Sequence, residues 1–193
     1  MSKAKKKRRL NRDLVLAKAM QLIDDAGSAD LVSLKELAAE LNIRPPSLYN
    51  HISGLDDLHA GLRVVALSEM LADFQRAIAG KMGREALEGI AHAYRAFARA
   101  HPGVYPLTLI GHPFDAEHTA VSNQIIQLIL LVLASYGLRG NEAMHAVRGF
   151  RSAIHGFISL EATGGFALPL GKDESFAVLV ELILDGVAQK KNR

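Results

Sequence analysis

The chain has 193 residues, of which 49% are apolar and 22% are charged, and only six are prolines. The formal net charge of +3 is unevenly distributed along the chain. Seven of the 23 lysines and arginines precede the first acidic residue, Asp13, and the rest of the chain has 16 basic and 20 acidic residues. Together with the absence of cysteine, these values exclude a disordered or fibrous protein, a disulfide framework and a thiolate zinc site.

The basic residues at the N-terminus predict local attraction to a polyanion. We interpret residues 1–10 as a basic flexible arm that either contacts DNA or only aids solubility, since composition allows both. A signal peptide would need an apolar segment after these charges, but charged helical sequence follows, so we expect a cytoplasmic protein. The most apolar stretch, Ile125 to Ala134, is interrupted by Gln127 and is far shorter than the roughly 18 residues that span a bilayer. We interpret it as a buried helix.

Apolar residues recur throughout at spacings of three and four, which predicts an all-α fold. The first helix is expected from about Asn11 to Ala26, because its apolar residues share one face and Gly27 can supply the left-handed end. Ser33 and Glu36 form a capping-box pattern, which predicts the start of a second helix. That helix has about two turns and ends at Asn42, a residue that tolerates the left-handed conformation of a tight turn.

Pro45 and Pro46 mark the start of a short third helix, because proline is tolerated in the first turn, where amide donors have no partner. Ser53 is the expected N-cap of the next helix, whose first turn carries Asp56 and Asp57. Residues 11–55 are therefore predicted to form a three-helix, helix-turn-helix domain for DNA binding.

Five longer helices are predicted to form a second, helical domain over residues 56–193. Glycines and a Pro-Gly pair separate them. They are expected at about Asp56 to Ala79, Arg84 to Ala100, Ala116 to Tyr136, Asn141 to Thr163 and Asp173 to Gln189.

A helix-turn-helix lays its second helix in the major groove of DNA. The stretch from Leu37 to Ile52, with Leu48-Tyr49-Asn50-His51 at its centre, resembles the DNA-binding motif of the TetR (tetracycline-repressor-like) family. The alternative, a purely structural helix pair, does not account for this core. The resemblance implies that base edges are faced by Arg44, Pro45, Pro46, Ser47 and Asn50, and that phosphates or neighbouring bases are held by Lys35, Tyr49 and His51.

The chemistry of these residue types agrees with the resemblance. Arginine can pair with guanine through two hydrogen bonds, and asparagine can do the same with adenine. One position departs from the family pattern: Leu55 stands where the family usually has a lysine. A contact to the DNA backbone is therefore expected to be absent there, and the basic arm is a candidate to replace it.

The C-terminal part carries a second resemblance. Ile154 to Glu161, followed by Gly164-Gly165-Phe166, resembles the WHG-type regulatory domain of the same family, although the chain has no tryptophan. This resemblance implies that the last two long helices form a four-helix bundle with those of a second copy. The small residues Gly149, Ser152, Ala153 and Gly156 share one helix face, where another helix can approach closely.

The final helix is apolar on nearly all sides, which also favours a subunit interface. We expect Leu179 and Ile183 to lie in this interface with the four small residues. The alternative is that the final helix and the helix with the four small residues are central helices of a monomer.

Aromatic side chains with a few polar tips predict a site for a small apolar or amphipathic effector, although such a stripe is more often plain core. The candidates are Tyr94, Phe97, His101, Tyr105, Leu109, His112, Phe114, Phe150 and Ile154. The histidines lack the spacing of metal ligands, so no metal and no cofactor are expected.

These observations predict a ligand-responsive transcriptional regulator, a repressor that binds a palindromic operator as a homodimer. The sequence has no phosphate-cradling glycine loop, no carboxylate cluster for a metal and no nucleophile motif, so we expect no enzyme. Two alternatives remain open at this point: an enzyme subunit tethered to DNA, and an architectural DNA-binding protein without sequence preference.

Overall fold

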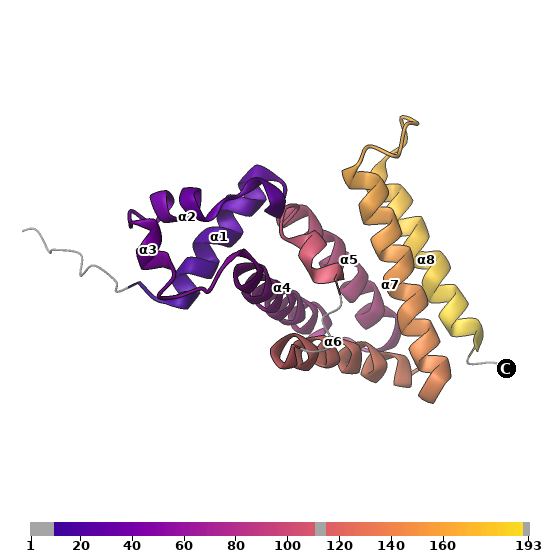
Figure 1. Cartoon of the computed structure of the whole chain (residues 1–193). Helices are drawn as coiled ribbons and strands as arrows, with labels where there is room; N and C mark the ends of the chain where they lie inside the picture. The colour runs from indigo at the N-terminus through magenta and orange to yellow at the C-terminus, as the bar shows by residue number, and fades with distance from the viewer. Residues whose placement is uncertain (1–9, 111–114, 191–193) are drawn as a thin grey trace, which may run out of the picture. The chain divides into compact units, whose positions relative to one another are not determined.

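The computed structural model describes residues 10–110 and 115–190, and these ranges contain helices and no strand (Figure 1). The predicted all-α fold is confirmed. The elements are α1 (Arg12–Ala26), η1 (Ala29–Leu31), α2 (Leu34–Glu40), α3 (Pro45–Leu48), α4 (Leu55–Ile78), α5 (Gly83–Ala100), η2 (Tyr105–Leu109), α6 (Ala116–Ala134), α7 (Gly140–Ala162) and α8 (Lys172–Lys190). The predicted bounds of the five longer helices lie within two residues of these.

The described residues form two compact units. The first unit, which we call the head, extends to Ala66 and also includes Gly103–Ile110. The second unit, which we call the body, comprises Leu67–Pro102 and the described residues after the gap at 111–114. The chain therefore passes between the units three times: within α4, after Pro102 and after Ile110.

This division differs from the boundary expected after residue 55. The first turns of α4 belong to the head because Leu58 and Leu62 are almost completely buried in it. No local feature of the sequence marks the point inside α4 at which the head gives way to the body.

The helix ends in the head follow the predicted local chemistry. The Asn11 side chain accepts a hydrogen bond from the Leu14 amide at 2.9 Å, and Gly27 ends α1 with a left-handed φ of 78°. Both bonds of the capping box between Ser33 and Glu36 are present. Asn42 adopts a φ of 55°, as the predicted turn requires.

The predicted role of Ser53 is wrong. Helix α4 begins at Leu55, so Gly54 precedes it directly, and the Gly54 carbonyl accepts from the Leu58 amide. Ser53 instead donates its backbone amide to the Asp57 carboxylate at 2.7 Å. The Asp57 carboxylate therefore accepts from an amide that precedes α4, which is a different bond from the one that Ser53 was expected to accept.

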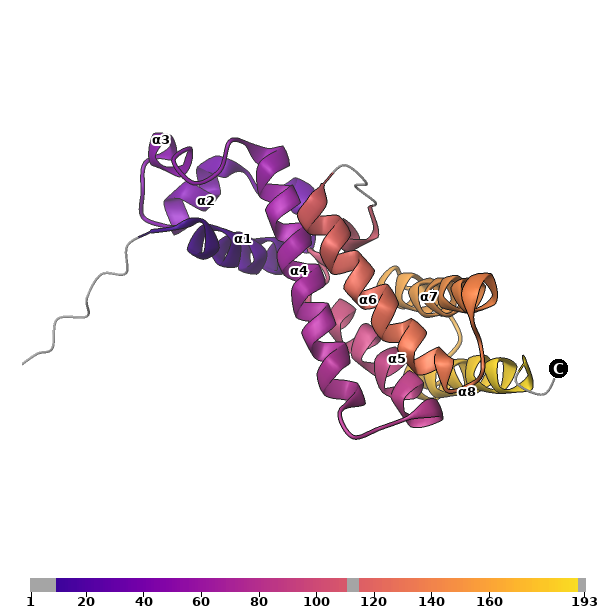
Figure 2. The ribbon, with the colours of Figure 1, turned by 90° about the horizontal axis from the view of Figure 1, so that it is seen from below.

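The body consists of the second half of α4 together with α5, α6, α7 and α8 (Figures 1 and 2). Helix α5 packs against α6, α7 and α8, and α7 packs against α8. Large apolar side chains such as Phe74, Ile90, Leu133 and Phe176 fill the core between them. Burial of this apolar surface is the main source of stability for such a bundle.

Helix α6 is buried on one face only, which corrects the interpretation of Ile125 to Ala134 as a buried helix. Ile129, Val132 and Leu133 point into the core, but Leu131 is 70% exposed. Over its full 19 residues α6 has the length and hydropathy of a membrane-spanning helix, and it is the one such helix in the described ranges. A single helix of this kind is weak evidence for a membrane, and one face of α6 packs on α5 and α7.

Candidate nucleic-acid interface and regulatory core

The predicted DNA-reading residues form an exposed face on the head. Leu48 and Ile52 are buried, which turns the polar side of α3 outward. Within residues 10–110, the side chains of Lys35, Arg44 and Asn50 enter no hydrogen bond or ion pair, so they remain available to a ligand. The residues exposed in this way are Lys35, Arg44, Pro45, Pro46, Ser47, Tyr49 and Asn50, whereas His51 is half-buried.

Helix α3 is only four residues long, and the turns on both sides hold it in place. The Ile43 amide donates to the Ala38 carbonyl at 3.0 Å, and the His51 amide donates to the Leu48 carbonyl at 2.9 Å. Two prolines at its start restrict the backbone further. The head therefore presents the exposed face in a fixed conformation, and little conformational entropy is lost when it binds.

Arg12 joins the end of this face to the rest of the head. Its guanidinium donates to both carboxylate oxygens of Asp57, at 2.6 and 3.0 Å, and to the His51 carbonyl at 3.0 Å. The hydrogen bonds from Arg12 and from the Ser53 amide lower the pKa of Asp57 to about 2. Arg12 was counted only as one of the seven basic residues before the first acid, but the structure uses it to hold the chain that follows α3.

Leu55, the departure from the family pattern, is the first residue of α4 and is 40% exposed. Its hydrocarbon side chain offers no donor to a phosphate. The basic residues before residue 10, which were expected to compensate, lie outside the described residues.

The structure brings together only some of the residues predicted to bind an effector. Tyr94, Phe97, Phe150 and Ile154 are buried in the body. The His101 ring contacts the Phe97 ring in a tilted arrangement, with the ring centroids 4.7 Å apart. Tyr105 and Leu109 belong to the head. His112 and Phe114 lie outside the described residues. The nine candidates therefore do not form one cluster within one unit, and their role stays a prediction.

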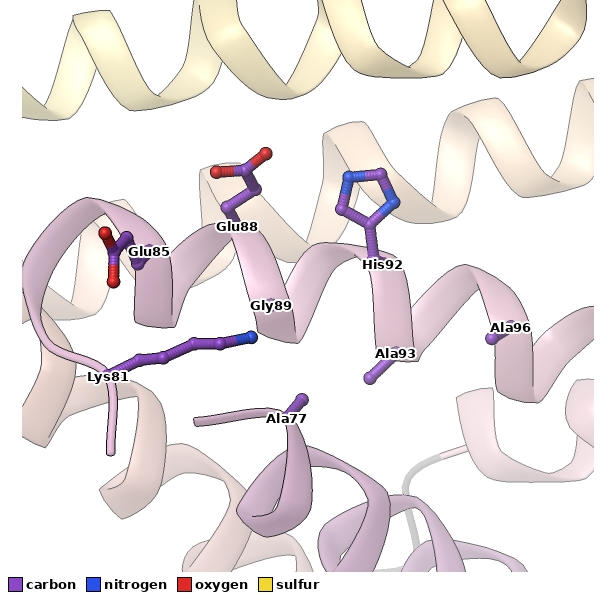
Figure 3. Close-up of a pocket in the computed structure, with 8 residues that line it drawn as sticks. All are labelled: Ala77, Lys81, Glu85, Glu88, Gly89, His92, Ala93 and Ala96. Atoms are coloured by element: carbon purple, nitrogen blue, oxygen red, sulfur yellow. The ribbon is translucent and has the colours of Figure 1, made fainter. Parts of the chain in front are cut away.

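A groove of about 570 Å³ lies in the body beside α5 (Figure 3). Its lining is small and polar: Ala77, Lys81, Glu85, Glu88, Gly89, His92, Ala93 and Ala96. Gly89 permits this geometry, because an added Cβ would lie 2.8 Å from the Ala77 carbonyl oxygen. This groove was not predicted from the sequence, and its charged lining does not match the predicted apolar effector. None of the described residues forms a metal-binding cluster.

A buried arginine fastens α5 to α7 and α8. Arg95 is 6% exposed and donates to both carboxylate oxygens of Glu161, at 2.6 and 2.8 Å, and its Nη2 lies 2.8 Å from Asp173. The guanidinium carbon lies 4.7 Å from the centre of the Phe176 ring and 5.3 Å from that of Phe157. The hydrogen bond from Arg95 lowers the pKa of Glu161. No local pattern indicated this cluster, because α5, α7 and α8 contribute residues that are far apart along the chain.

The residues predicted to form the dimer interface lie on a face of α7 that the single chain leaves uncovered. Gly149 and Ser152 are exposed, Ala153 and Gly156 are half-buried, and a Cβ added to either glycine would meet no atom within 4 Å. On α8, Leu179 and Ile183 are half-buried. Val178 and Leu182, which were not among the predicted interface residues, are 56% and 67% exposed.

Comparisons with known proteins agree on one family. The family model described as "Tetracyclin repressor-like, C-terminal domain" matches residues 87–183. The HTH-type transcriptional regulator YobS of Bacillus subtilis is 34% identical over 179 residues, which cover 92% of this chain and 93% of YobS. The HTH-type transcriptional regulator Rv0681 of Mycobacterium tuberculosis is 36% identical over 160 residues, covering 81% of this chain and 72% of Rv0681.

Solved structures share the fold. The TetR family protein ActR of Streptomyces coelicolor, in complex with (S)-DNPA, superposes with a TM-score of 0.70 at 18% identity, covering 95% of this chain and 99% of ActR. At this level of identity the likeness concerns the fold alone.

Proposed function

Because the chain belongs to the TetR family of HTH-type transcriptional regulators, we propose that it is a ligand-responsive repressor that binds a palindromic operator as a homodimer in the cytoplasm. Its relatives are regulators and not enzymes, and the chain is likewise a regulator. The finer parts of the proposal, namely the operator contacts, the dimer and the effector, each rest on a separate feature of the structure.

The observation that carries the operator proposal is the exposed face of the head. The Arg44 guanidinium can donate two hydrogen bonds to guanine, and the Asn50 amide can both donate to and accept from adenine in the major groove. Both side chains are exposed and unpaired in the head. Lys35 and Tyr49 carry no sequence information in this scheme and hold the backbone phosphates instead. Proline and serine at the start of α3 supply small contacts beside thymine methyl groups.

The experiment is a selection of duplexes from a random pool by the purified protein, followed by titration of the selected and of scrambled duplexes at physiological salt. We expect an inverted repeat to emerge and to bind at least about 10³-fold more tightly than the scrambled sequence. Equal affinity for both would contradict the proposal and would favour an architectural protein, whose affinity depends on salt but not on sequence.

The dimer proposal rests on the uncovered face of α7 and α8. The stripe of small residues on α7 is open, Val178 and Leu182 on α8 are exposed, and we propose that a second copy covers both. An interface of this kind is self-complementary under a two-fold axis. It would hold two heads at the spacing of one helical turn of DNA, about 34–36 Å, or a multiple of it.

For the effector we propose a small apolar or amphipathic molecule in the body, near Tyr94, Phe97, His101, Phe150 and Ile154. The complex of ActR with (S)-DNPA supports a ligand site within this fold. A thermal-shift screen of apolar compounds, followed by operator titration with each hit, tests this. A compound that lowers operator affinity tenfold must itself bind the DNA complex tenfold more weakly, a coupling of about 1.4 kcal/mol. Hits that stabilise the protein without changing operator affinity would contradict a sensing role.

A further inference from the structure

We propose that Arg12 is a positioning residue for base reading. It holds the backbone next to Asn50, so its loss reduces the discrimination between operator and other DNA more than it reduces the affinity for DNA in general. The inference rests on the proposed function, because it assigns a role in operator reading to a residue that is not among the predicted DNA contacts. The residues that carry it all lie within the head.

Asn50 lies beyond the end of α3. The helix ends at Leu48, and Tyr49 is its C-cap. The chain then turns, and the amides of His51 and Ile52 both donate to the Leu48 carbonyl, at 2.9 and 3.2 Å. Asn50 is therefore held by the turn around it and not by a continuing helix.

Arg12 binds this turn from the first turn of α1. The last carbonyls of a helix have no partner within the helix, and an arginine side chain can donate to them. Nη1 of Arg12 donates to the His51 carbonyl at 3.0 Å. Since His51 directly follows Asn50, this contact fixes the backbone one residue from the side chain that we propose to read a base.

Asp57 of α4 orients Arg12 and also holds the chain beyond the turn. Its two carboxylate oxygens accept from the Arg12 guanidinium at 2.6 and 3.0 Å, and Oδ2 also accepts from the Ser53 amide at 2.7 Å. Pairing at two points fixes the orientation of the guanidinium as well as its distance. Ile52 is 2% exposed, so the backbone is held on both sides of a buried anchor.

Gly61 leaves the space in which the guanidinium lies. It follows Asp57 by about one turn of α4. A Cβ at this position would lie 3.1 Å from Nη2 of Arg12 and 2.8 Å from a methyl carbon of Leu16. The start of α1 therefore packs directly on α4. Lysine has one ammonium group in place of the planar fork, so it could not make all the contacts of Arg12 at once.

Loss of these contacts should affect base reading and phosphate binding differently. A base edge is read through two hydrogen bonds of defined geometry, so a small displacement of the Asn50 amide weakens both. Phosphate contacts depend mainly on charge, and Lys35 on α2 takes no part in the hydrogen bonds of Arg12.

A loss of stability alone would have another effect. If only a fraction of the molecules is competent to bind, the affinity for every duplex falls by the same factor. The ratio of operator affinity to scrambled-duplex affinity therefore reports positioning and not stability.

The first test needs no DNA. Amide hydrogen exchange is compared in the wild type, Arg12→Ala and Lys18→Ala. Arg12→Ala should speed exchange of the amides of residues 51–53 by about tenfold or more relative to the Ile43 amide, which precedes α3. Lys18→Ala is the matched control, because it removes a cation of α1 whose partner, Glu40 at 3.0 Å, lies on α2. Unchanged relative exchange in Arg12→Ala would overturn the role of Arg12.

The second test titrates the same proteins and Arg12→Lys with the selected operator and with scrambled duplexes. In Arg12→Ala the ratio of the two affinities should fall about tenfold, while the affinity for the scrambled duplex changes by less than about threefold. Lys18→Ala should keep the wild-type ratio. Arg12→Lys should keep the scrambled affinity and recover only part of the ratio. Full recovery would show that charge alone suffices and would overturn the positioning role.

A double-mutant cycle tests whether Arg12 acts through Asn50. In a protein that already carries Asn50→Ala, Arg12→Ala should cause little further loss of discrimination. Independent losses in the cycle, or equal falls in operator and scrambled affinity in Arg12→Ala, would overturn the proposal. Failure of the wild type to select any duplex would instead contradict the proposed function, and the exchange experiment would still decide whether Arg12 holds the chain after α3.

Discussion

Asn50 and Lys35 are both exposed on the head, but their side-chain chemistry predicts that substituting them changes DNA binding in different ways. Asn50→Ala should relax the preference at one base pair of the operator by about 1–3 kcal/mol, because the asparagine amide pairs with a base edge. Lys35→Ala should weaken selected and scrambled duplexes alike and should reduce the slope of affinity against salt by about one. Binding titrations at several salt concentrations, over a set of single-base operator variants, separate the two effects. A uniform loss in Asn50→Ala would show that it contacts only the backbone.

The lowered pKa of Asp57 predicts that the head loses stability as the pH falls. The pKa of Asp57 is about 2 in the folded chain, against an ordinary value of 3.8, so the ionised form favours folding. This contribution is fully present above the unfolded pKa and is lost as the pH falls through the folded pKa, which places the loss between about pH 4 and pH 2. Asp57→Asn should lower the free energy of unfolding at pH 7 by about 1 kcal/mol, since the partly exposed pair with Arg12 is screened by solvent.

Urea unfolding of the wild type and of Asp57→Asn at pH 7 and in steps down to pH 2 measures this difference. Asp56→Asn serves as the control, because it removes the same charge from the first turn of α4 without touching Arg12. A difference between wild type and Asp57→Asn that stays constant down to pH 2 would contradict the assigned role.

The exposed residues that we propose to face DNA could be named from the sequence, whereas the residues that hold them in place could not. Leu48, Ile52 and the two prolines are local signals, and a short helix with a buried face must expose the opposite face. Arg12, by contrast, stood in a run of basic residues, and its partner Asp57 lies 45 positions away. Nothing in either neighbourhood distinguishes this arginine from the six basic residues before it.

Among contacts between helices, we expect the ion pairs of Arg95 to contribute most to stability, so its substitution should cause the largest loss. Removal of one partner from a buried ion pair leaves the other charge without compensation, at a cost of about 3–5 kcal/mol. Arg95→Ala should therefore lower the free energy of unfolding of the body by about 3 kcal/mol or more. Arg99→Ala is the matched control, because Arg99 also faces Asp173 from α5, at 3.5 Å, but is 60% exposed. Equal losses in the two variants, measured by chemical unfolding, would contradict a special role for the buried cluster.

Helix positions were predictable because their ends depend on residues nearby. The capping box at Ser33, the left-handed Gly27 and the turn at Asn42 each act over a few residues, and all are present as expected. The Ser53 cap failed because α4 begins at Leu55, so Gly54 and not Ser53 directly precedes the helix. The groove beside α5 was missed for a different reason: it exists because Gly89 lets α4 approach, and the spacing of residues along α5 does not reveal that.

For the whole molecule, the uncovered face of α7 and α8 predicts the oligomeric state. Leu182→Glu should convert the dimer to a monomer at micromolar concentration, because a second copy would bury the new carboxylate without a partner. Gly156→Leu should weaken the dimer by overfilling the close helix crossing. Leu131→Glu is the control, since Leu131 is equally exposed but lies on α6. Sedimentation velocity distinguishes the species, and a wild-type chain that sediments as a monomer would contradict the proposed interface.

The passage of Gly103–Ile110 through the head also bears on how such regulators exchange parts by recombination. A crossover at residue 66 would transfer a head without this segment, and the cavity left by Val104 and Leu107 would open its core. A crossover after Ile110 would keep both pieces of the head together, along with the first part of the body. The smallest block that can be inherited or grafted intact is therefore the contiguous stretch up to Ile110, and a chimera joined there should fold where one joined inside α4 would not.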